Sequence, residues 1–319
     1  MRRRLLFALR ICAWVMVGAF AVLAARRLDW DQVFRAFAHA DVGLLALATI
    51  VGLPCTLLAG LRWSSLVKAV RPVPRLTAVA AMYVGQAASA LLPMRAGEAV
   101  RTELLARATG MGRATSLGTV ALDHSVNGVV MFLFAAVLPA LLPVPRWLAA
   151  LVWIGACGAI ALGLLLLRLA QHPEQVPSGR LAAIAVRVRS GLMAARSPRA
   201  VAQAAAFAAL SWSVEIVTAM IALHAFDLPH DLAHAMAVLF GVNLALAIPA
   251  PPAALGSFEL GAGLALTAFG GHTERAAAFA LGYHALQLLP TLVMGGVMLP
   301  AVRRPARVAP LGDGLTQHA

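Results

Sequence analysis

Long apolar segments dominate this chain, and they restrict it to a membrane. Six of them reach the roughly 20 residues that an α-helix needs to cross the hydrocarbon layer of a bilayer. They lie near residues 5–24, 42–61, 116–138, 147–168, 200–222 and 276–301. Only 12% of the residues are charged, whereas an average soluble domain has about a quarter. The pattern therefore predicts an all-α, polytopic integral membrane protein.

Positive charge is concentrated between the apolar segments. The net charge is +13, and in a soluble protein such an excess would suggest nucleic acid as a partner. Here the basic clusters are better explained as topology signals, because cytoplasmic loops of membrane proteins are rich in Arg and Lys. We expect four clusters in the cytoplasm and the uncharged-to-acidic loop 227–234 in the periplasm. The cytoplasmic clusters are Arg2–Arg4, 62–75, 180–199 and 303–307. This predicts a bacterial inner-membrane protein with both termini in the cytoplasm.

Two further apolar regions, 77–113 and 232–275, are interrupted by proline and glycine. Counting spans between the basic clusters makes the first region begin and end in the cytoplasm, which predicts a re-entrant hairpin with its tip at "PMRAGE". The second begins and ends in the periplasm, as a second hairpin or as two full crossings. Its break reads "IPAPPAALGSFE". Opposed broken helices of this kind are typical of inverted-repeat transporters. The breaking residues are Pro93, Pro249, Pro251, Pro252 and Gly256.

These assignments make residues 1–302 one transmembrane domain of about eight apolar segments. The tail 303–319 is rich in Pro, Gly and polar residues, so we expect it to be disordered and cytoplasmic. The polar stretch 169–199 contains "SGRLAAIAVRVRSGLMAAR", which predicts an amphipathic helix on the membrane surface. The segment 25–41 is interpreted as a loop.

The first break carries charges that suit an anionic ligand. Pro93 ends the incoming helix, Gly97 allows a turn, and a new helix is expected to begin near Glu98. The unpaired N–H groups and the dipole at that helix start favour a phosphate or carboxylate, and Arg95 and Arg101 add full positive charges. The alternative is that Glu98–Arg101 is an ordinary helix-face ion pair, as we interpret Glu103–Arg107.

Other ionisable side chains lie inside apolar segments, where charge is costly and often functional. Glu259 follows the second break, and Asp123 has the spacing to pair with an arginine of the first hairpin. Each such residue has a functional reading and a structural one, since interhelical hydrogen bonds also hold membrane bundles together. The candidates for a substrate site are Arg95, Gly97, Glu98, Arg101, Asp123, His124, Glu215, Glu259 and His284.

Patterns for covalent chemistry are missing from the sequence. It contains no HExxH, CxxC, phosphate-binding loop or nucleophile elbow. Cys12, Cys55 and Cys157 all lie in apolar runs and form neither a disulfide nor a metal pattern. We therefore expect no enzyme activity, no cofactor and no metal. A membrane-embedded transferase is a weak alternative, because no nucleophile or metal set supports it.

The motifs around the two breaks resemble those of the lysylphosphatidylglycerol synthase transmembrane-region family, also called flippase-like domain proteins. "VGQAASALLPMRAGEAVRTELLARATGMGRATSLGTVALDHSVNGV" resembles its first signature, and "LALAIPAPPAALGSFELGAGLALTAFG" its second. "ERAAAFALGYHALQLLPTLVMGGV" is similar to its closing span. The resemblance covers nearly the whole chain. It departs from the family pattern at Asp123–His124, where the family usually has Glu-Arg, and at Phe258, where it usually has Arg.

This resemblance implies a protein that moves lipids or lipid-linked anionic molecules between the leaflets of the inner membrane. The partners would then be phospholipids or a lipid-linked substrate, with no role for nucleic acid. The alternative is an accessory protein that transports nothing and positions an enzyme of lipid, glycolipid or cell-envelope synthesis. A polar cavity between the two breaks would favour transport over the accessory role.

Overall fold

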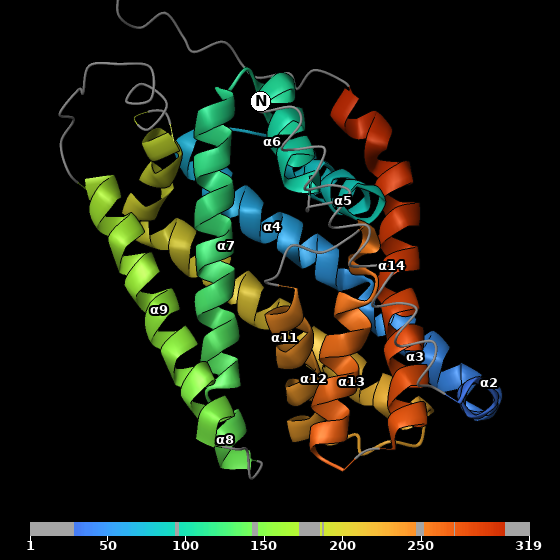
Figure 1. The fold of residues 1–319 in the computed structure, drawn as a ribbon. Coiled ribbons are helices and arrows are strands. Elements are labelled where there is room, and N and C mark those ends of the chain that lie inside the picture. Colours follow the sequence, from blue (N-terminus) through green and yellow to red (C-terminus); the bar gives the residue numbers. More distant parts are fainter. Residues whose placement is uncertain are drawn as a thin grey trace, which may run out of the picture.

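The protein is a helical bundle (Figure 1). The computed structural model describes residues 29–92, 96–141, 146–171, 186, 188–246, 252–270 and 272–303. Within these ranges the regular elements are helices and no strand occurs. The prediction of an all-α membrane protein is confirmed.

Five helical segments in the described part of the chain are long and apolar enough to cross a membrane. They are α3 (Val42–Gly52) with α4 (Pro54–Val70), α7 (Arg113–Ala135) with α8 (Leu138–Leu141), α9 (Arg146–Gln171), α11 (Pro198–Ala225) and α14 (Thr273–Arg303). Each coincides with a span predicted from the sequence. The sixth predicted span, 5–24, lies outside the described residues, as do the tail from residue 304 and residues 178–185 and 187 of the predicted surface helix.

Helix starts follow from local capping. The Asp41 carboxylate accepts a hydrogen bond from the backbone N–H of Leu44 at 3.0 Å and begins α3. Ser197 caps α11, and Pro198 occupies its first turn, where its missing N–H costs nothing. In these positions the side chain or ring supplies what the first helical turn lacks.

Two sequence-based assignments were wrong. The predicted loop 25–41 contains helix α2 (Trp30–His39), which Asp29 caps and whose Val33 is buried. The predicted end of the second span at residue 61 is also wrong, because α4 continues to Val70. Arg62 therefore lies inside a helix and is buried, and it does not belong to the loop cluster in which we had placed it.

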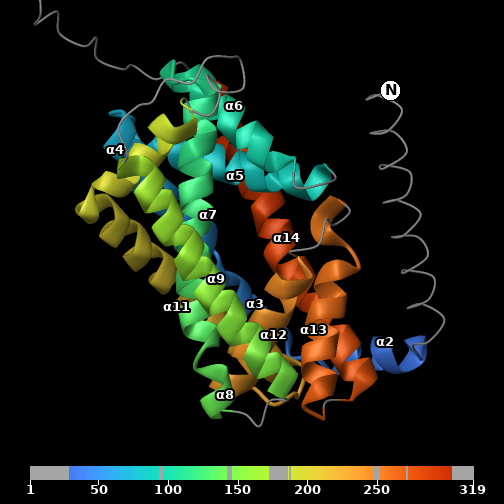
Figure 2. The same ribbon diagram turned by 60° about the vertical axis from the view of Figure 1, so that its left-hand side comes forward.

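The first interrupted region forms a hairpin of α5 (Arg75–Leu91) and α6 (Gly97–Thr109). The two helices pack on each other, and α6 returns to the upper end of the bundle in Figures 1 and 2. Gly97 is not the turn that we predicted but the first residue of α6. A methyl group there would collide with the carbonyl oxygen of Gly85 and with Ser89, so Gly97 permits the close approach of the two helices.

The second interrupted region is also a hairpin, made of α12 (Leu232–Ala245), the short helix η2 (Pro252–Ala254) and α13 (Ser257–Ala268). Helices of 14 and 12 residues reach only about 21 and about 18 Å, less than the ~30 Å of a bilayer core. Both helices are thus shorter than a full crossing requires. Helices α12 and α13 lie in the lower half of the bundle in Figures 1 and 2.

Two hydrophobic clusters hold the hairpins in the bundle. The larger joins α11, α12, α13 and α14 around Phe279 and Tyr283, which are fully buried. The smaller joins α4, α5 and α6 around Trp63. Both hairpins pack on α14, and the first also packs on α4.

Candidate functional site

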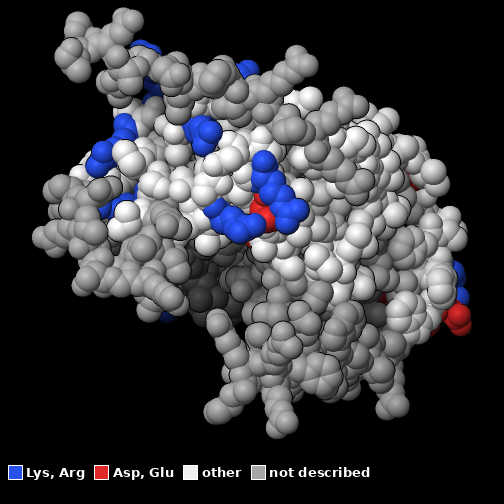
Figure 3. Space-filling model, turned by 90° about the horizontal axis from the view of Figure 1, so that it is seen from above, with Lys and Arg blue, Asp and Glu red and all other residues white. Residues whose placement is uncertain are grey.

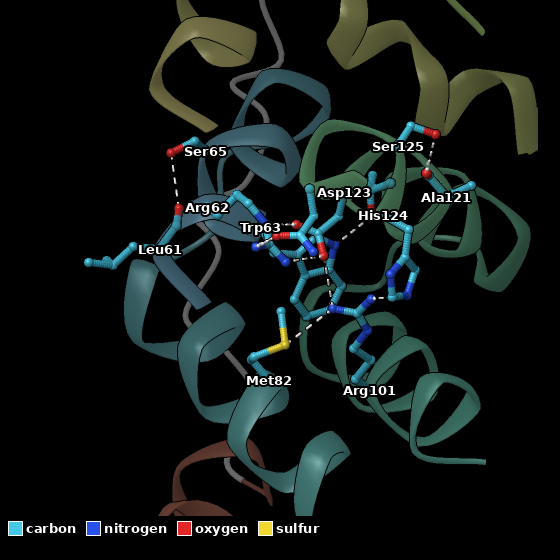
Figure 4. Close-up of polar contacts among 12 residues, drawn as sticks. Leu61, Arg62, Trp63, Ser65, Met82, Arg101, Ala121, Asp123, His124 and Ser125 are labelled. Carbon is cyan, nitrogen blue, oxygen red and sulfur yellow. Dashed lines mark hydrogen bonds and ion pairs between the residues drawn. The ribbon is translucent and has the colours of Figure 1, made fainter. Parts of the chain in front are cut away.

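A buried network centred on Asp123 links three helices (Figure 4). Arg62 of α4 donates from Nε to Asp123 Oδ1 at 2.7 Å and from its Nη1 to the Asn127 side-chain oxygen at 2.6 Å. Arg101 of α6 donates from Nη1 to Asp123 Oδ2 at 3.2 Å. Asp123 is completely buried, so one carboxylate of α7 neutralises part of the charge of two buried arginines.

Arg101 is held on every side. Its Nε donates to Glu98 at 2.5 Å, and Nη1 also lies 3.2 Å from the sulfur of Met82. The guanidinium carbon stands 4.9 Å from the ring centre of Trp63, a cation–π geometry. The side chain is therefore positioned by α4, α5, α6 and α7 together, and it has little freedom to reorient.

His124 shares one nitrogen between two partners of opposite charge. Its Nε2 lies 3.1 Å from Arg101 Nη2 and 3.2 Å from Glu98 Oε1. Without a proton, Nε2 accepts a hydrogen bond from Arg101, whereas with a proton it donates to Glu98. The partner to which Nε2 is hydrogen-bonded therefore depends on which ring nitrogen carries a hydrogen.

A second acid–histidine pair stands at the tip of the other hairpin. Glu259 accepts a hydrogen bond from the backbone N–H of Gly256 at 2.7 Å, closing the first turn of α13, and its other oxygen lies 2.6 Å from His284 Nδ1 of α14. The His284 ring stacks on Phe258, with centroids 4.3 Å apart. Gly256 has a φ of 83°, which glycine adopts without steric cost.

The tips of both hairpins line one cavity of about 350 Å³. Glu98, Arg101 and His124 contribute from one side, and Ala253 and His284 from the other. Glu259 is not among the residues that line this cavity, whereas its partner His284 is. Glu98 of the first hairpin and His284 of α14 both take part in the wall of this cavity.

Glu215 lies in a different part of the interior. It lines two smaller cavities, of about 240 and 100 Å³. Its Oε2 accepts hydrogen bonds from Gln287 Nε2 at 3.2 Å and from the Tyr283 hydroxyl at 3.4 Å. The structure does not bring Glu215 into contact with the arginine network.

The site residues predicted from the sequence thus divide into three groups. Glu98, Arg101, Asp123 and His124 meet in one network. Gly97, Glu259 and His284 support the hairpins or the cavity wall, and Glu215 stands apart. Arg95, Pro93, Pro249 and Pro251 lie outside the described residues, while Pro252 begins η2.

Sequence reasoning missed Arg62 and Asn127 as members of the network. The signal for Arg62 was its position one residue beyond the predicted span, where a longer helix makes it an intramembrane arginine. A repeated pattern was also missed. In each hairpin a glutamate in the first turn of the returning helix contacts a histidine of the next long helix, Glu98 with His124 and Glu259 with His284.

The outer end of α6 is solvated and separate from this network. Glu103 pairs with Arg107 at 2.6 Å and with Arg113 at 2.5 Å, and both arginines are about three-quarters exposed at 74%. Hydrogen bonds from Arg113 and Arg107 lower the pKa of Glu103 to about 2. Seen from this end, Lys and Arg side chains gather around an acidic group (Figure 3).

The profile of the family described as the lysylphosphatidylglycerol synthase TM region matches residues 5–295. This range contains four of the five long helical segments, most of α14, both hairpins and the whole arginine network. The chain belongs to this family. The lysylphosphatidylglycerol synthase TM region is a multi-pass membrane domain, and its name relates the chain to lipid modification or transport. No curated protein shows significant similarity to the chain.

Proposed function

We propose that this protein moves a lipid or lipid-linked anionic molecule between the leaflets of the bacterial inner membrane. This proposal rests on the placement of two buried arginines, Arg62 and Arg101, in the wall of a cavity that both hairpins line. A cavity of about 350 Å³ is within the range of small-molecule sites. It can accommodate a polar headgroup while the acyl chains stay among the lipids.

The anion would enter by exchange. With His124 neutral, Arg62 and Arg101 are balanced by Asp123 and Glu98, so an added phosphate must replace one carboxylate. Asp123 is completely buried, whereas the Glu98 side chain is 32% exposed at the cavity. Glu98 is therefore the partner that leaves, and the phosphate takes its place on Arg101. Charge-assisted hydrogen bonds from a fixed guanidinium favour this exchange.

The two hairpins would open the cavity alternately to the two leaflets. The first enters from the end that carries exposed Arg107 and Arg113, which the positive-inside rule places in the cytoplasm. The second enters from the opposite end. We propose that the hairpins are re-entrant and that small movements of their tips open the cavity to one leaflet at a time, without covalent chemistry. Broken helices meeting near mid-membrane serve this purpose in many transporters.

Translocation is tested with fluorescent phosphatidylglycerol in vesicles containing the full chain. Because a lost charge-assisted hydrogen bond typically costs a factor of ten or more, we expect Arg101→Gln to slow transfer at least about tenfold. The matched control is Arg107→Gln, an exposed arginine of the same helix, which leaves the rate within about twofold. Equal rates for both variants would overturn the proposal.

A second variant separates binding from folding. Glu98→Gln removes the competing carboxylate and keeps the size of the side chain, so it should increase the affinity for the fluorescent anionic lipid while Arg101→Gln decreases it. Opposite effects from two residues in direct contact cannot come from general destabilisation. A wild-type protein that binds no anionic lipid and moves none would favour the accessory role.

Orientation is tested separately by thiol labelling after the three native cysteines have been replaced. Arg107→Cys and Asp227→Cys place thiols at opposite ends of the bundle. A membrane-impermeant reagent added to intact cells with a permeable outer membrane should label Asp227→Cys and spare Arg107→Cys. The reverse pattern would invert the topology.

A further inference from the structure

Glu215 stands out among the intramembrane carboxylates because it has no cationic partner in the described part of the chain. Asp123 pairs with two arginines, Glu98 with Arg101 and His124, and Glu259 with His284. A carboxylate without a counter-charge inside a membrane protein is costly in its ionised form. The neutral acid avoids that cost.

The groups that face Glu215 do not supply a positive charge. Tyr283 and Gln287 of α14 donate to its Oε2, and the Cys55 thiol of α4 is a further hydrogen-bonding neighbour. Arg62 lines the same 240 Å³ cavity, but its guanidinium is engaged by Asp123 and Asn127.

The other helices packed against α11 add no titratable side chain next to Glu215. Helix α3 contains none in its sequence, and Asp123 and His124 of α7 are engaged in the arginine network. His284 of α14 pairs with Glu259, and the His234 ring of α12 pairs with Asp231 outside the cavity. Arg196 of η1 donates to carbonyls at the end of α9. The carboxyl of Glu215 therefore has donors around it and no cation.

Trp212 provides an independent indication that the cavity is polar. It lies one helical turn before Glu215 on α11, lines the 240 Å³ cavity, and is more than nine-tenths buried. Its indole Nε1 has no hydrogen-bond partner among the described residues. Buried N–H groups are almost always satisfied, so this donor requires an acceptor oxygen such as water. Trp212 lines two cavities, and of these the 240 Å³ cavity is the one with polar side chains in its wall.

The cavity is also connected to the arginine network. Gln86 and Gln287 line all three cavities, and Arg62 and Asn127 line both the 240 and the 350 Å³ cavity. Gln287 is itself a hydrogen-bond donor to Glu215. Polar side chains are therefore shared between the walls of the headgroup site and those of the cavity at Glu215.

We propose that Glu215 is a proton-binding site of this protein. A proton delivered by water from the connected cavities binds Oε1 and leaves as the carboxyl is ionised, while Oε2 keeps its bonds to Tyr283 and Gln287. The arrangement suits a proton better than a metal cation such as Na⁺, because Tyr283 and Gln287 present hydrogens, not lone pairs, to the carboxylate. The site stands on its own geometry, and its role in powering translocation rests on the proposed function.

Infrared spectroscopy of the full chain in phosphatidylethanolamine and phosphatidylglycerol nanodiscs tests this site. At neutral pH we expect a carboxylic-acid C=O band that disappears in Glu215→Gln and persists in the matched variant Glu103→Gln. The band should not change when K⁺ is exchanged for Na⁺ at constant pH. A spectrum without the band, a band that survives in Glu215→Gln, or a band that Na⁺ removes would each overturn the proposal.

Tyr283→Phe is a second variant that tests the assignment even if Glu215→Gln does not fold correctly. It keeps the ring packing and removes one hydrogen bond to the carboxyl, so the C=O band should persist at a shifted frequency. A band unaffected by Tyr283→Phe would belong to another carboxyl and would contradict the assignment. These spectra contain no translocated lipid, so a failed translocation assay and a failed proton site are distinguishable.

Discussion

The two hairpins have the same construction but different chemistry. In each, two short helices approach closely through a glycine pair, Gly85 with Gly97 and Gly241 with Gly261. In each, a glutamate in the first turn of the returning helix contacts a histidine of the next long helix. The shared parts set the geometry in which the two helices of each hairpin pack.

The difference lies in what surrounds the glutamate. Glu98 belongs to a network with two buried arginines, whereas Glu259 has one histidine and a backbone N–H. The second tip is instead fixed by the stacking of Phe258 on His284 and by the left-handed backbone of Ala253 and Ala254. The first hairpin therefore supplies the charged groups, and the second supplies a mostly apolar wall with one histidine.

This comparison also bears on the predicted inverted repeat. The hairpins enter from opposite ends and carry equivalent contacts at equivalent positions, although their sequences share little beyond proline, glycine and glutamate. The likeness between the hairpins therefore lies in their contacts. A likeness of this kind supports the idea that one hairpin is the inverted counterpart of the other.

The largest expected effect is at Asp123. Removing its carboxylate in Asp123→Ala leaves Arg62 and Arg101 buried and without their shared partner, which should lower the free energy of unfolding by about 3–5 kcal/mol. Glu259→Ala, the comparable change in the second hairpin, removes a cap and one histidine contact and should cost about 1–2 kcal/mol. Chemical denaturation in detergent measures both. Equal losses of unfolding free energy in the two variants would contradict the comparison, because the first hairpin would then depend no more on its charges than the second depends on Glu259.

The next effect tests what the hairpins share. Gly97→Ala and Gly261→Ala each place a methyl group against backbone of the partner helix, and both should destabilise by about 1–3 kcal/mol through overpacking. Gly263→Ala is the control, because no atom lies within 4 Å of the added methyl group. Thermal unfolding in detergent gives the ranking. A Gly261→Ala protein as stable as Gly263→Ala would show that only the first hairpin is closely packed.

A smaller effect separates the two histidines. His284 is buried and stacked on Phe258, whereas the His124 side chain is 46% exposed. His284→Ala should therefore cost about 2 kcal/mol, through a lost buried hydrogen bond and lost ring contacts, and His124→Ala less than half of that. Lipid transfer should show the opposite order, because His124 contacts Glu98, the carboxylate that the phosphate would replace on Arg101. Parallel losses in stability and transfer would remove this distinction.

The sequence predicted much of this fold for simple physical reasons. Span length and apolar composition were sufficient to locate five long helices, and proline-rich breaks with charge located both hairpins. The structure brings Asp123 to Arg101, as predicted from an acidic residue in a span next to a basic hairpin. The Glu98–Arg101 pair followed from helical spacing alone.

What the sequence could not provide were contacts between distant helices. Arg62 was assigned to a loop because a helix was assumed to end after about 20 residues, yet α4 continues inside the protein, where Asp123 and Asn127 compensate the charge. The pairing of Glu259 with His284 depends on how α13 packs against α14, and the placement of His284 in the cavity wall depends on the same packing. No local pattern contains that information.

The smallest expected effect concerns the outer half of α6 and separates it from the network half. The lowered pKa of Glu103 means that its ion pairs stabilise the folded state above its usual pKa of 4.5, and that this contribution is lost as pH falls toward about 2. Unfolding temperatures of the wild type and Glu103→Gln should therefore differ slightly above pH 4.5 and converge as the pH falls. Because both arginine partners are exposed, salt should reduce the difference at the higher pH as well. A difference in unfolding temperature that persists in acid and in salt would mean that Glu103 is part of the buried network. The outer and inner halves of α6 would then not be electrostatically separate.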